Sequence, residues 1–322
     1  MEVAPFPFIV GRGRSGTTLL RAMLDSHPLV AIPGESNFVV NFAASRRRYE
    51  REDRFQMERF LHDLLGHFGF ARMGVSADSV TDSFRSSPPS DLPTAIRRVF
   101  EISARDRGKS RYGDKTPNYV MHMRLLTGLF PEARFVHIIR DGRDVALSYL
   151  EGGWGPKGVA GNALYWRRFV SHGREEGRRL GSERYCEVRY EDLLSDPEGQ
   201  VRRVCGFIDL EFDPVMLRYF ERPDILGLMP WGRQSHARLT LPPTKGLRDW
   251  RREMSAGDVA LFETLAGDLL DDLGYERTTT AAPPMALRLQ AGRQWTRFQA
   301  RYATQRFKKQ VRRRTNRPWP AG

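Results

Sequence analysis

The apolar and polar positions of this chain predict short buried strands, each followed by an amphipathic helix. Three apolar runs have the length of buried strands, and they lie at 6–10, 134–139 and 185–189. Apolar positions at helical spacing follow the runs, at about 19–24, 141–150 and 197–209. Strands that alternate with helices in this way predict an α/β fold, in which helices flank a parallel sheet.

A long, charged and mostly helical insertion separates the first two strands, at about 40–110. Its serine- and proline-rich segment, 83–93, is typical of a loop, and so is the glycine-rich segment 151–161. We expect residues 1–277 to form one domain, and residues 278–322 to form a linker followed by a basic tail.

The positive charge of the chain is concentrated in this tail. The sequence has 52 basic and 39 acidic residues, and the tail holds eleven of the basic ones and none of the acidic ones. A helix over 286–314 would place apolar residues on one face and arginines on another, namely Leu287, Ala291, Trp295, Phe298 and Tyr302 against Arg293, Arg297 and Arg301.

A basic amphipathic helix of this kind is typical of elements that lie on anionic membrane surfaces or bind acidic partners. The alternative is a helix that packs on the domain and exposes its charges to solvent. Nucleic acid is the least favoured partner, because no recognition motif accompanies the charge.

Composition and the N-terminal sequence indicate where in the cell the protein is expected. No apolar run reaches the about 18 residues of a membrane-spanning helix, and the chain leads directly into its first strand without a secretory signal pattern. The two cysteines, Cys186 and Cys205, are too few for a disulfide scaffold or a zinc site. We therefore expect a cytoplasmic protein, whose tail is the part that would contact a membrane surface.

The glycine-rich turn after the first strand predicts a P-loop-like phosphate site. Backbone N–H groups and the N-terminus of the following helix would converge there on an anion. From Gly11 to Thr18 the turn nearly matches G-x-x-x-x-G-K-[ST], but Thr17 replaces the lysine that reaches the β- and γ-phosphates of a triphosphate. The loop therefore predicts phosphate binding that differs from that of an ATPase.

The end of the second strand also departs from the ATPase pattern. ATPases carry a metal-binding acid at such a position, whereas this strand ends in Arg140. A guanidinium repels a metal ion but matches a phosphate bidentately. Ser148, two turns into the next helix, is a candidate for the same anion. An ion pair between Arg140 and Asp144 is the alternative interpretation.

These segments resemble the sulfotransferases that use 3′-phosphoadenosine 5′-phosphosulfate (PAPS). Residues 14–18, Arg-Ser-Gly-Thr-Thr, look like the family's 5′-phosphosulfate loop, and Arg140 and Ser148 look like its 3′-phosphate site. The motifs are most similar to those of tyrosylprotein sulfotransferases and their bacterial relatives. The resemblance covers most of 1–275, and it accounts for the missing lysine because PAPS has no β- or γ-phosphate.

The resemblance implies roles for individual residues. Glu35 would be the general base that takes the acceptor's proton, and Arg14 and Lys115 would stabilise charge on the leaving phosphate. A capping role for Glu35, and an exposed turn for Lys115 paired with Asp114, are the alternatives. The residues implied to bind the donor are Gly13, Arg14, Ser15, Gly16, Thr17, Thr18, Arg140, Ser148, Tyr190, Lys245 and Gly246.

The implied function is sulfuryl transfer from PAPS to an acceptor hydroxyl or amine, with 3′-phosphoadenosine 5′-phosphate (PAP) as the leaving product and no metal ion. A small molecule, a carbohydrate, a lipid and a peptide all remain open as acceptors. One alternative is a non-catalytic phosphonucleotide-binding protein. The other is a small-molecule kinase of the P-loop type, which would need the loop lysine and the strand-end acid that this sequence lacks.

Overall fold

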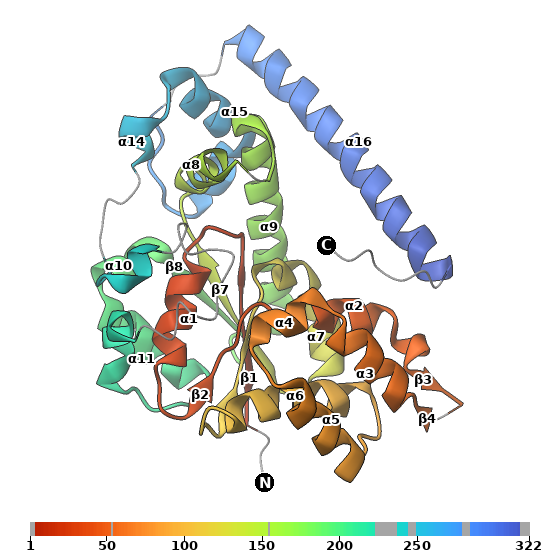
Figure 1. Ribbon diagram of the computed structural model, residues 1–322. Helices are drawn as coiled ribbons and strands as arrows, with labels where there is room; N and C mark the ends of the chain where they lie inside the picture. Colours follow the sequence, from red (N-terminus) through yellow and green to blue (C-terminus); the bar gives the residue numbers. More distant parts are fainter. Residues whose placement is uncertain are drawn as a thin grey trace.

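The computed structural model describes residues 4–52, 54–153, 155–222, 237–243, 249–278 and 284–315. At its centre lies a parallel sheet of four strands in the order β6–β1–β7–β8 (Figure 1). These strands are β1 (Phe6–Gly11), β6 (Asp114–Lys115), β7 (Ala133–Ile139) and β8 (Tyr185–Arg189). The predicted α/β fold with a parallel sheet is confirmed.

The apolar character of β1 and β7 follows from cover on both faces of the sheet. Phe8 pairs in register with Phe135, and both side chains are fully buried in a cluster with the helices of the insertion. The alternate positions Ile9 and Val136 point to the opposite face, where they join a second cluster. The sheet is therefore the middle layer of three.

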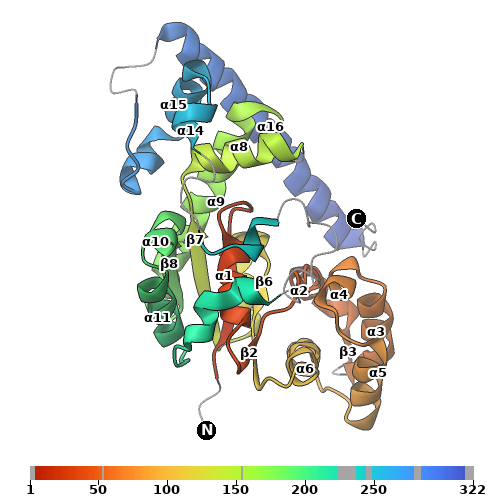
Figure 2. The same cartoon turned by 60° about the vertical axis from the view of Figure 1, so that its left-hand side comes forward.

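Different helices cover the two faces. One face carries α1 (Thr17–Asp25), α10 (Tyr190–Ser195), α11 (Pro197–Phe207) and η3 (Pro214–Glu221). The other carries the insertion, with α2 (Phe38–Ala44), α3 (Met57–Leu65), α4 (Phe68–Met73), α5 (Ala77–Ser86) and α6 (Leu92–Arg105), together with α7 (Met123–Leu129). Figures 1 and 2 show the two groups on opposite sides of the sheet.

Two predicted loops are shorter than the sequence indicated. Within 83–93, α5 continues to Ser86, and α6 begins at Leu92 because the Asp91 side chain accepts a hydrogen bond from the Thr94 N–H and Pro93 occupies the first turn. Within 151–161, α8 (Gly142–Gly152) continues to Gly152 and α9 (Gly158–Leu180) begins at Gly158, so the connection is shorter than the predicted loop. Residues 190–192, Tyr-Glu-Asp, form the start of the helix α10 (Tyr190–Ser195).

Further elements belong to the described part of the chain. They are β2 (Val30–Ala31), η1 (Arg46–Arg48), β3 (Glu50–Arg51), β4 (Arg54–Phe55), β5 (Arg111–Tyr112), η2 (Pro117–His122), η4 (Ala237–Thr240), α14 (Trp250–Glu253) and α15 (Ala256–Asp272). Within the described residues, no helix has the length and apolar character needed to cross a membrane.

The basic tail forms one long helix, α16 (Met285–Thr315), which runs beside α9 and α15 (Figure 1). Ala291 and Phe298 are buried against these helices, and the ring of Phe298 meets that of Tyr165 edge-on at 5.0 Å. Arg293 and Arg297 are exposed. Packing on the domain, one of the two interpretations of the tail, therefore describes the first half of α16.

Candidate active site

The glycine-rich turn links β1 to α1 with a tightly bent backbone. Arg14 and Gly16 have φ angles of +70° and +95°, and the Ser15 N–H donates to the Arg12 carbonyl at 3.2 Å. A Cβ at Gly16 would lie 2.3 Å from the Tyr190 ring, so only glycine fits there. The turn thereby brings the N-terminus of α1 next to Tyr190, and N–H groups of such a terminus bind anions.

Arg14 and Ser148 meet at this turn. The Arg14 Nε donates to the Ser148 Oγ at 2.7 Å, although 134 positions separate the two residues in the chain. The sequence assigned Arg14 to the 5′ end of a nucleotide and Ser148 to its 3′-phosphate. The structure joins these two predicted subsites through one hydrogen bond, which no sequence pattern indicated.

Arg140 lies at the end of β7, buried beside Tyr190. One terminal nitrogen donates to Asp144 at 3.1 Å, so the ion pair weighed as an alternative is present. The guanidinium also lies over the Tyr190 ring, 4.6 Å from its centroid. Its buried Nε has no hydrogen-bond partner among the described residues. This donor, together with the anion-binding turn, fits a second phosphate at the edge of the same site.

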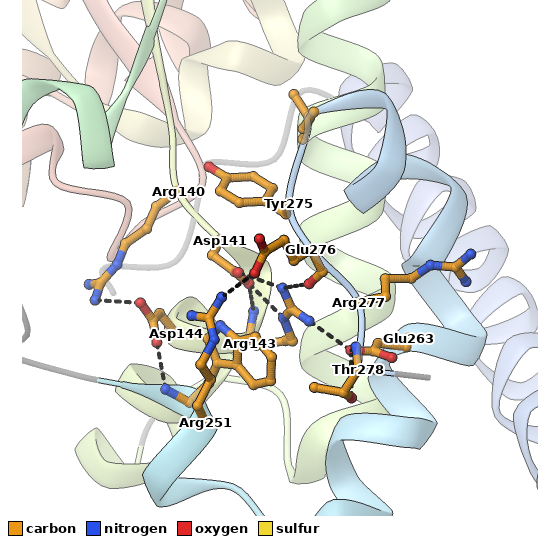
Figure 3. A network of polar contacts seen from close by, with 12 residues as sticks. Arg140, Asp141, Arg143, Asp144, Arg251, Glu263, Tyr275, Glu276, Arg277 and Thr278 are labelled. Carbon is orange, nitrogen blue, oxygen red and sulfur yellow. Dashed lines mark hydrogen bonds and ion pairs between the residues drawn. The ribbon is translucent and has the colours of Figure 1, made fainter. Parts of the chain in front are cut away.

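The position of Arg140 depends on a buried ionic network that the sequence analysis missed (Figure 3). Arg143 is fully buried and donates to Asp141 and Glu263, at 2.7 Å each, and its guanidinium lies 3.5 Å from the centroid of the Trp250 ring. Asp141 also caps the N-terminus of α8. The network therefore fixes α8 against α14 and α15, immediately after Arg140. Its sequence signal was the charged run Arg-Asp-Gly-Arg at a buried strand end.

The segment that begins at Asp249 is hydrogen-bonded to the carboxylate that pairs with Arg140. The Trp250 N–H donates to the Asp144 carboxylate at 3.0 Å, and Asp144 in turn pairs with Arg140. Burial raises the pKa of Asp144, and the neighbouring Arg140 opposes this shift. The predicted donor-binding residues Lys245 and Gly246 lie outside the described residues.

Glu35 and Lys115 form an ion pair at the same end of the sheet. The Lys115 Nζ donates to the Glu35 Oε1 at 2.8 Å. Lys115 belongs to β6, where it pairs in register with Ile9, and its side chain is 2% exposed. Glu35 is one-third exposed. The alternative interpretation of Lys115, an exposed turn residue paired with Asp114, is wrong.

The pair sets the charge of both partners. Burial, the largest single influence, would raise the pKa of Glu35. The charge and the hydrogen bond of Lys115, with smaller contributions from Arg72 and Asn37, together outweigh it, and the pKa lies below its usual value. Burial lowers the pKa of Lys115, and the attraction of Glu35 only partly offsets this effect. A charged carboxylate beside a desolvated ammonium is an arrangement suited to proton removal and to stabilisation of developing negative charge.

Buried hydroxyl groups hold the segment that carries Glu35. The Tyr119 hydroxyl accepts from the Val39 N–H at 3.1 Å and lies 3.0 Å from the Ser36 hydroxyl. Asp114 is fully buried nearby, and burial raises its pKa to about 6. The first turn of α2 is therefore anchored to η2, directly after Lys115. No sequence pattern indicated this anchor.

We call the glycine-rich turn from Gly11 to Gly16 the phosphate turn. It is a close neighbour of the ion pair between Glu35 and Lys115. Tyr149, the residue after Ser148, touches the turn, because a Cβ at Gly13 would lie 2.5 Å from its hydroxyl. Burial raises the pKa of Tyr149, and the charges of both Arg14 and Glu35 act on the same hydroxyl. Carboxyl ends of parallel strands meet at one edge of a sheet, and here they bring the predicted base, cations and phosphate loop together.

Comparison with known proteins identifies the group to which this arrangement belongs. Residues 5–214 match the sulfotransferase family. The chain belongs to the sulfotransferase family. The resemblance stated from the sequence motifs is thus confirmed. The matched region of the chain contains Glu35, Lys115, Arg140 and the phosphate turn.

Individual relatives agree with this assignment. The chain is 26% identical over 224 residues to protein-tyrosine sulfotransferase A of Caenorhabditis elegans, and the match covers 68% of this chain and 53% of that protein. It is 28% identical over 254 residues to the omega-hydroxy-beta-dihydromenaquinone-9 sulfotransferase Stf3 of Mycobacterium bovis, covering 63% and 62% of the two chains. The chain thus spans about half the length of the first relative.

A solved structure shares the fold. The sulfotransferase domain of the olefin synthase of Synechococcus PCC 7002 superposes with a TM-score of 0.56 at 20% identity, and the match covers 91% of this chain and 94% of that domain. At this identity the likeness concerns the fold.

Proposed function

We propose that this sulfotransferase moves the sulfuryl group of PAPS to an acceptor hydroxyl or amine and releases PAP. The observation that carries the proposal is the Glu35–Lys115 ion pair of 2.8 Å, formed beside a phosphate turn that has threonine in place of the P-loop lysine. Membership of the sulfotransferase family supports it. The family match does not favour a kinase or a non-catalytic binding protein.

Two groups of residues fit the two ends of the donor. The N–H groups of the turn and the Arg14 side chain suit the 5′-phosphosulfate. The buried Nε of Arg140 and the Ser148 hydroxyl suit the 3′-phosphate, and the Tyr190 ring between Gly16 and Arg140 offers a flat surface to the nucleoside. PAPS supplies an activated sulfur atom whose bond to the phosphate oxygen breaks in the reaction.

In the proposed mechanism the chain moves one proton and balances one developing charge. Glu35, ionised at neutral pH, takes the proton of the acceptor as its oxygen or nitrogen bonds to sulfur. The electron pair of the broken bond stays on the leaving phosphate. Lys115 and Arg14 stabilise the negative charge that builds there, and the buried position of Lys115 strengthens its effect.

Calorimetric titration with PAP, ATP and AMP tests the donor assignment. We expect PAP to bind about tenfold or more tightly than either competitor, because only PAP places phosphates at both the turn and Arg140. The variant Arg140→Gln should lose this preference while AMP binding changes little. Equal affinities of the wild-type protein for PAP and AMP would contradict the proposal.

The acceptor is proposed only as a class. One relative is named for protein tyrosine and another for a hydroxylated menaquinone, so a hydroxyl group is the common feature. The structure of this chain offers a further indication of the acceptor's chemistry.

A further inference from the structure

A cavity of about 740 Å³ lies beside the candidate active site, a volume typical of pockets for small molecules. Its walls include Arg12 in the phosphate turn, Tyr149 on α8, Tyr165 on α9, and Arg297 with Phe298 on α16. We call it the tail cavity, because the basic tail closes one side of it.

Arg12 is an unusual cation for a protein interior. It is 7% exposed, and its guanidinium is surrounded by three aromatic rings, 4.1 Å from the centroid of Tyr149, 5.5 Å from that of Tyr165 and 5.1 Å from that of Phe169. Within the part of the chain that the structure describes, it forms no ion pair and its buried Nε has no hydrogen-bond partner. Burial accordingly lowers its pKa.

Two other buried arginines near the site form ion pairs. Arg140 contacts Asp144, and Arg143 contacts Asp141 and Glu263. Burial of a cation without a carboxylate partner costs free energy unless a ligand supplies the negative charge. Since Arg12 lines the tail cavity, the missing anion would enter from that side.

The rest of the cavity has the same charge. Lys157 and Arg297 also line it, and the described residues that line it include no Asp or Glu. Tyr149, Tyr165 and Phe298 supply apolar surface between these cations. The lining therefore matches a molecule with an apolar body and a negative group.

One lining residue, Tyr149, links the cavity to the reacting groups. Tyr149 lines it, while its hydroxyl touches the turn at Gly13 and lies within the electrostatic influence of Arg14 and Glu35. A molecule held in the cavity would thus contact Tyr149, the residue on which the charge of the proposed base acts.

We propose that the tail cavity binds an acceptor that carries an anionic group, with Arg12 and Arg297 holding this group and the aromatic residues holding the apolar body. The inference rests on the proposed sulfuryl transfer and adds the chemical class of the acceptor. It makes α16 a part of the substrate site, with Arg297 as a residue that determines specificity.

A matched pair of probes tests this inference on the full chain saturated with PAP. The probes are para-hydroxyphenylpropanoate and its neutral carboxamide, which differ in charge but hardly in size, and their binding is measured by calorimetry. We expect the acid to bind about tenfold or more tightly than the amide. The variants Arg12→Gln and Arg297→Gln should each bring the two affinities together.

Arg293→Gln is the matched control, since Arg293 lies one turn away on α16 and lines a neighbouring hollow, but not the tail cavity. It should keep the preference for the acid. Replacement of the buried Arg12 could disturb folding. Arg297 is exposed, so Arg297→Gln tests the inference even if Arg12→Gln does not fold.

Three results would overturn the inference: equal affinity of the wild-type protein for acid and amide, no binding of either, or undiminished preference in Arg297→Gln. PAP binding separates this failure from that of the proposed function. A protein that binds PAP but ignores the acid's charge contradicts only the acceptor class, whereas a protein that does not bind PAP contradicts the sulfuryl transfer itself.

Discussion

At the scale of single residues, the Glu35–Lys115 pair has to serve two demands. Glu35 must be ionised to accept a proton, although burial disfavours its charge. Lys115 must stay protonated to stabilise a leaving group, although it is almost completely buried. Each charge is maintained by the other, so a change at one residue alters the titration of its partner.

The variant Lys115→Met tests this coupling. Without the ammonium, burial becomes the dominant influence and should raise the pKa of Glu35, so that the carboxylate is lost at a higher pH than in the wild-type protein. Carboxyl ¹³C NMR measures this pKa directly, and Glu35→Gln identifies the signal. An unchanged or lower pKa in Lys115→Met would show that Lys115 does not hold Glu35 in its charged form.

Gly16 permits a second residue-scale prediction. The variant Gly16→Ala combines an unfavourable φ of +95° with a clash against the Tyr190 ring, and we expect PAP affinity to fall about tenfold or more. Gly153→Ala is the control, because Gly153 has a φ of +67° but open space around it. It should cost about 1–2 kcal/mol of stability and leave PAP binding intact.

The double variant Gly16→Ala/Tyr190→Ala separates the two causes. If the ring clash distorts the turn, removal of the ring should restore part of the PAP affinity, and calorimetry of the four proteins yields the coupling. Strictly additive losses would mean that backbone strain alone is responsible.

At the scale of elements, the order of residues in the chain predicts the long strands and the helices that follow them, but it does not reveal β6. This strand has two residues, both polar in sequence and both buried in the structure. Apolar periodicity cannot mark such an element, since Lys115 is buried by pairing with Glu35 and not by hydrophobicity. The resemblance to a family therefore identified Lys115, while only the structure explains its position.

The same limit applies to contacts between distant segments. The bond from Arg14 to Ser148 and the Arg143 network join residues more than a hundred positions apart. Propensity and spacing describe the surroundings of one segment, and carry no information about which buried charges will meet. The loop predicted over 83–93 was too long for a local reason. Hydrogen bonds at the helix ends outweighed the composition of the segment, so that α5 ends at Ser86 and α6 begins at Leu92.

The Arg143 network makes a prediction at this scale. The variant Arg143→Met leaves the carboxylates of Asp141 and Glu263 buried without their cation, which should lower the free energy of unfolding by about 3–5 kcal/mol. Arg218→Met removes an exposed pair with Glu221 on η3 and should cost less than about 1 kcal/mol. Urea denaturation compares the two variants. Similar small losses in both would show that the network does not anchor α8.

At the scale of the whole molecule, a nearly neutral domain carries a strongly basic helix. The described contacts of α16 are nevertheless mainly apolar. Ala291 and Phe298 are buried in a cluster with α9 and α15, and Trp295 packs beside Phe298 at 6.4 Å between ring centroids. The arginines of this half point to solvent or to the tail cavity. Attachment of the tail should therefore depend on hydrophobic contact and hardly on charge.

Hydrogen exchange of the amides at 285–300 checks this conclusion. Protection should be similar at about 0.05 M and about 0.5 M salt, because screening weakens exposed ion pairs but not buried apolar contacts. The variant Phe298→Ala should lose protection across this segment while the sheet keeps its own, and Leu289→Ala, which alters a 58% exposed side chain of the same helix, should change little. If added salt released α16 and Phe298→Ala did not, the helix would be held by its charges, and the wall of the tail cavity would respond to ionic strength.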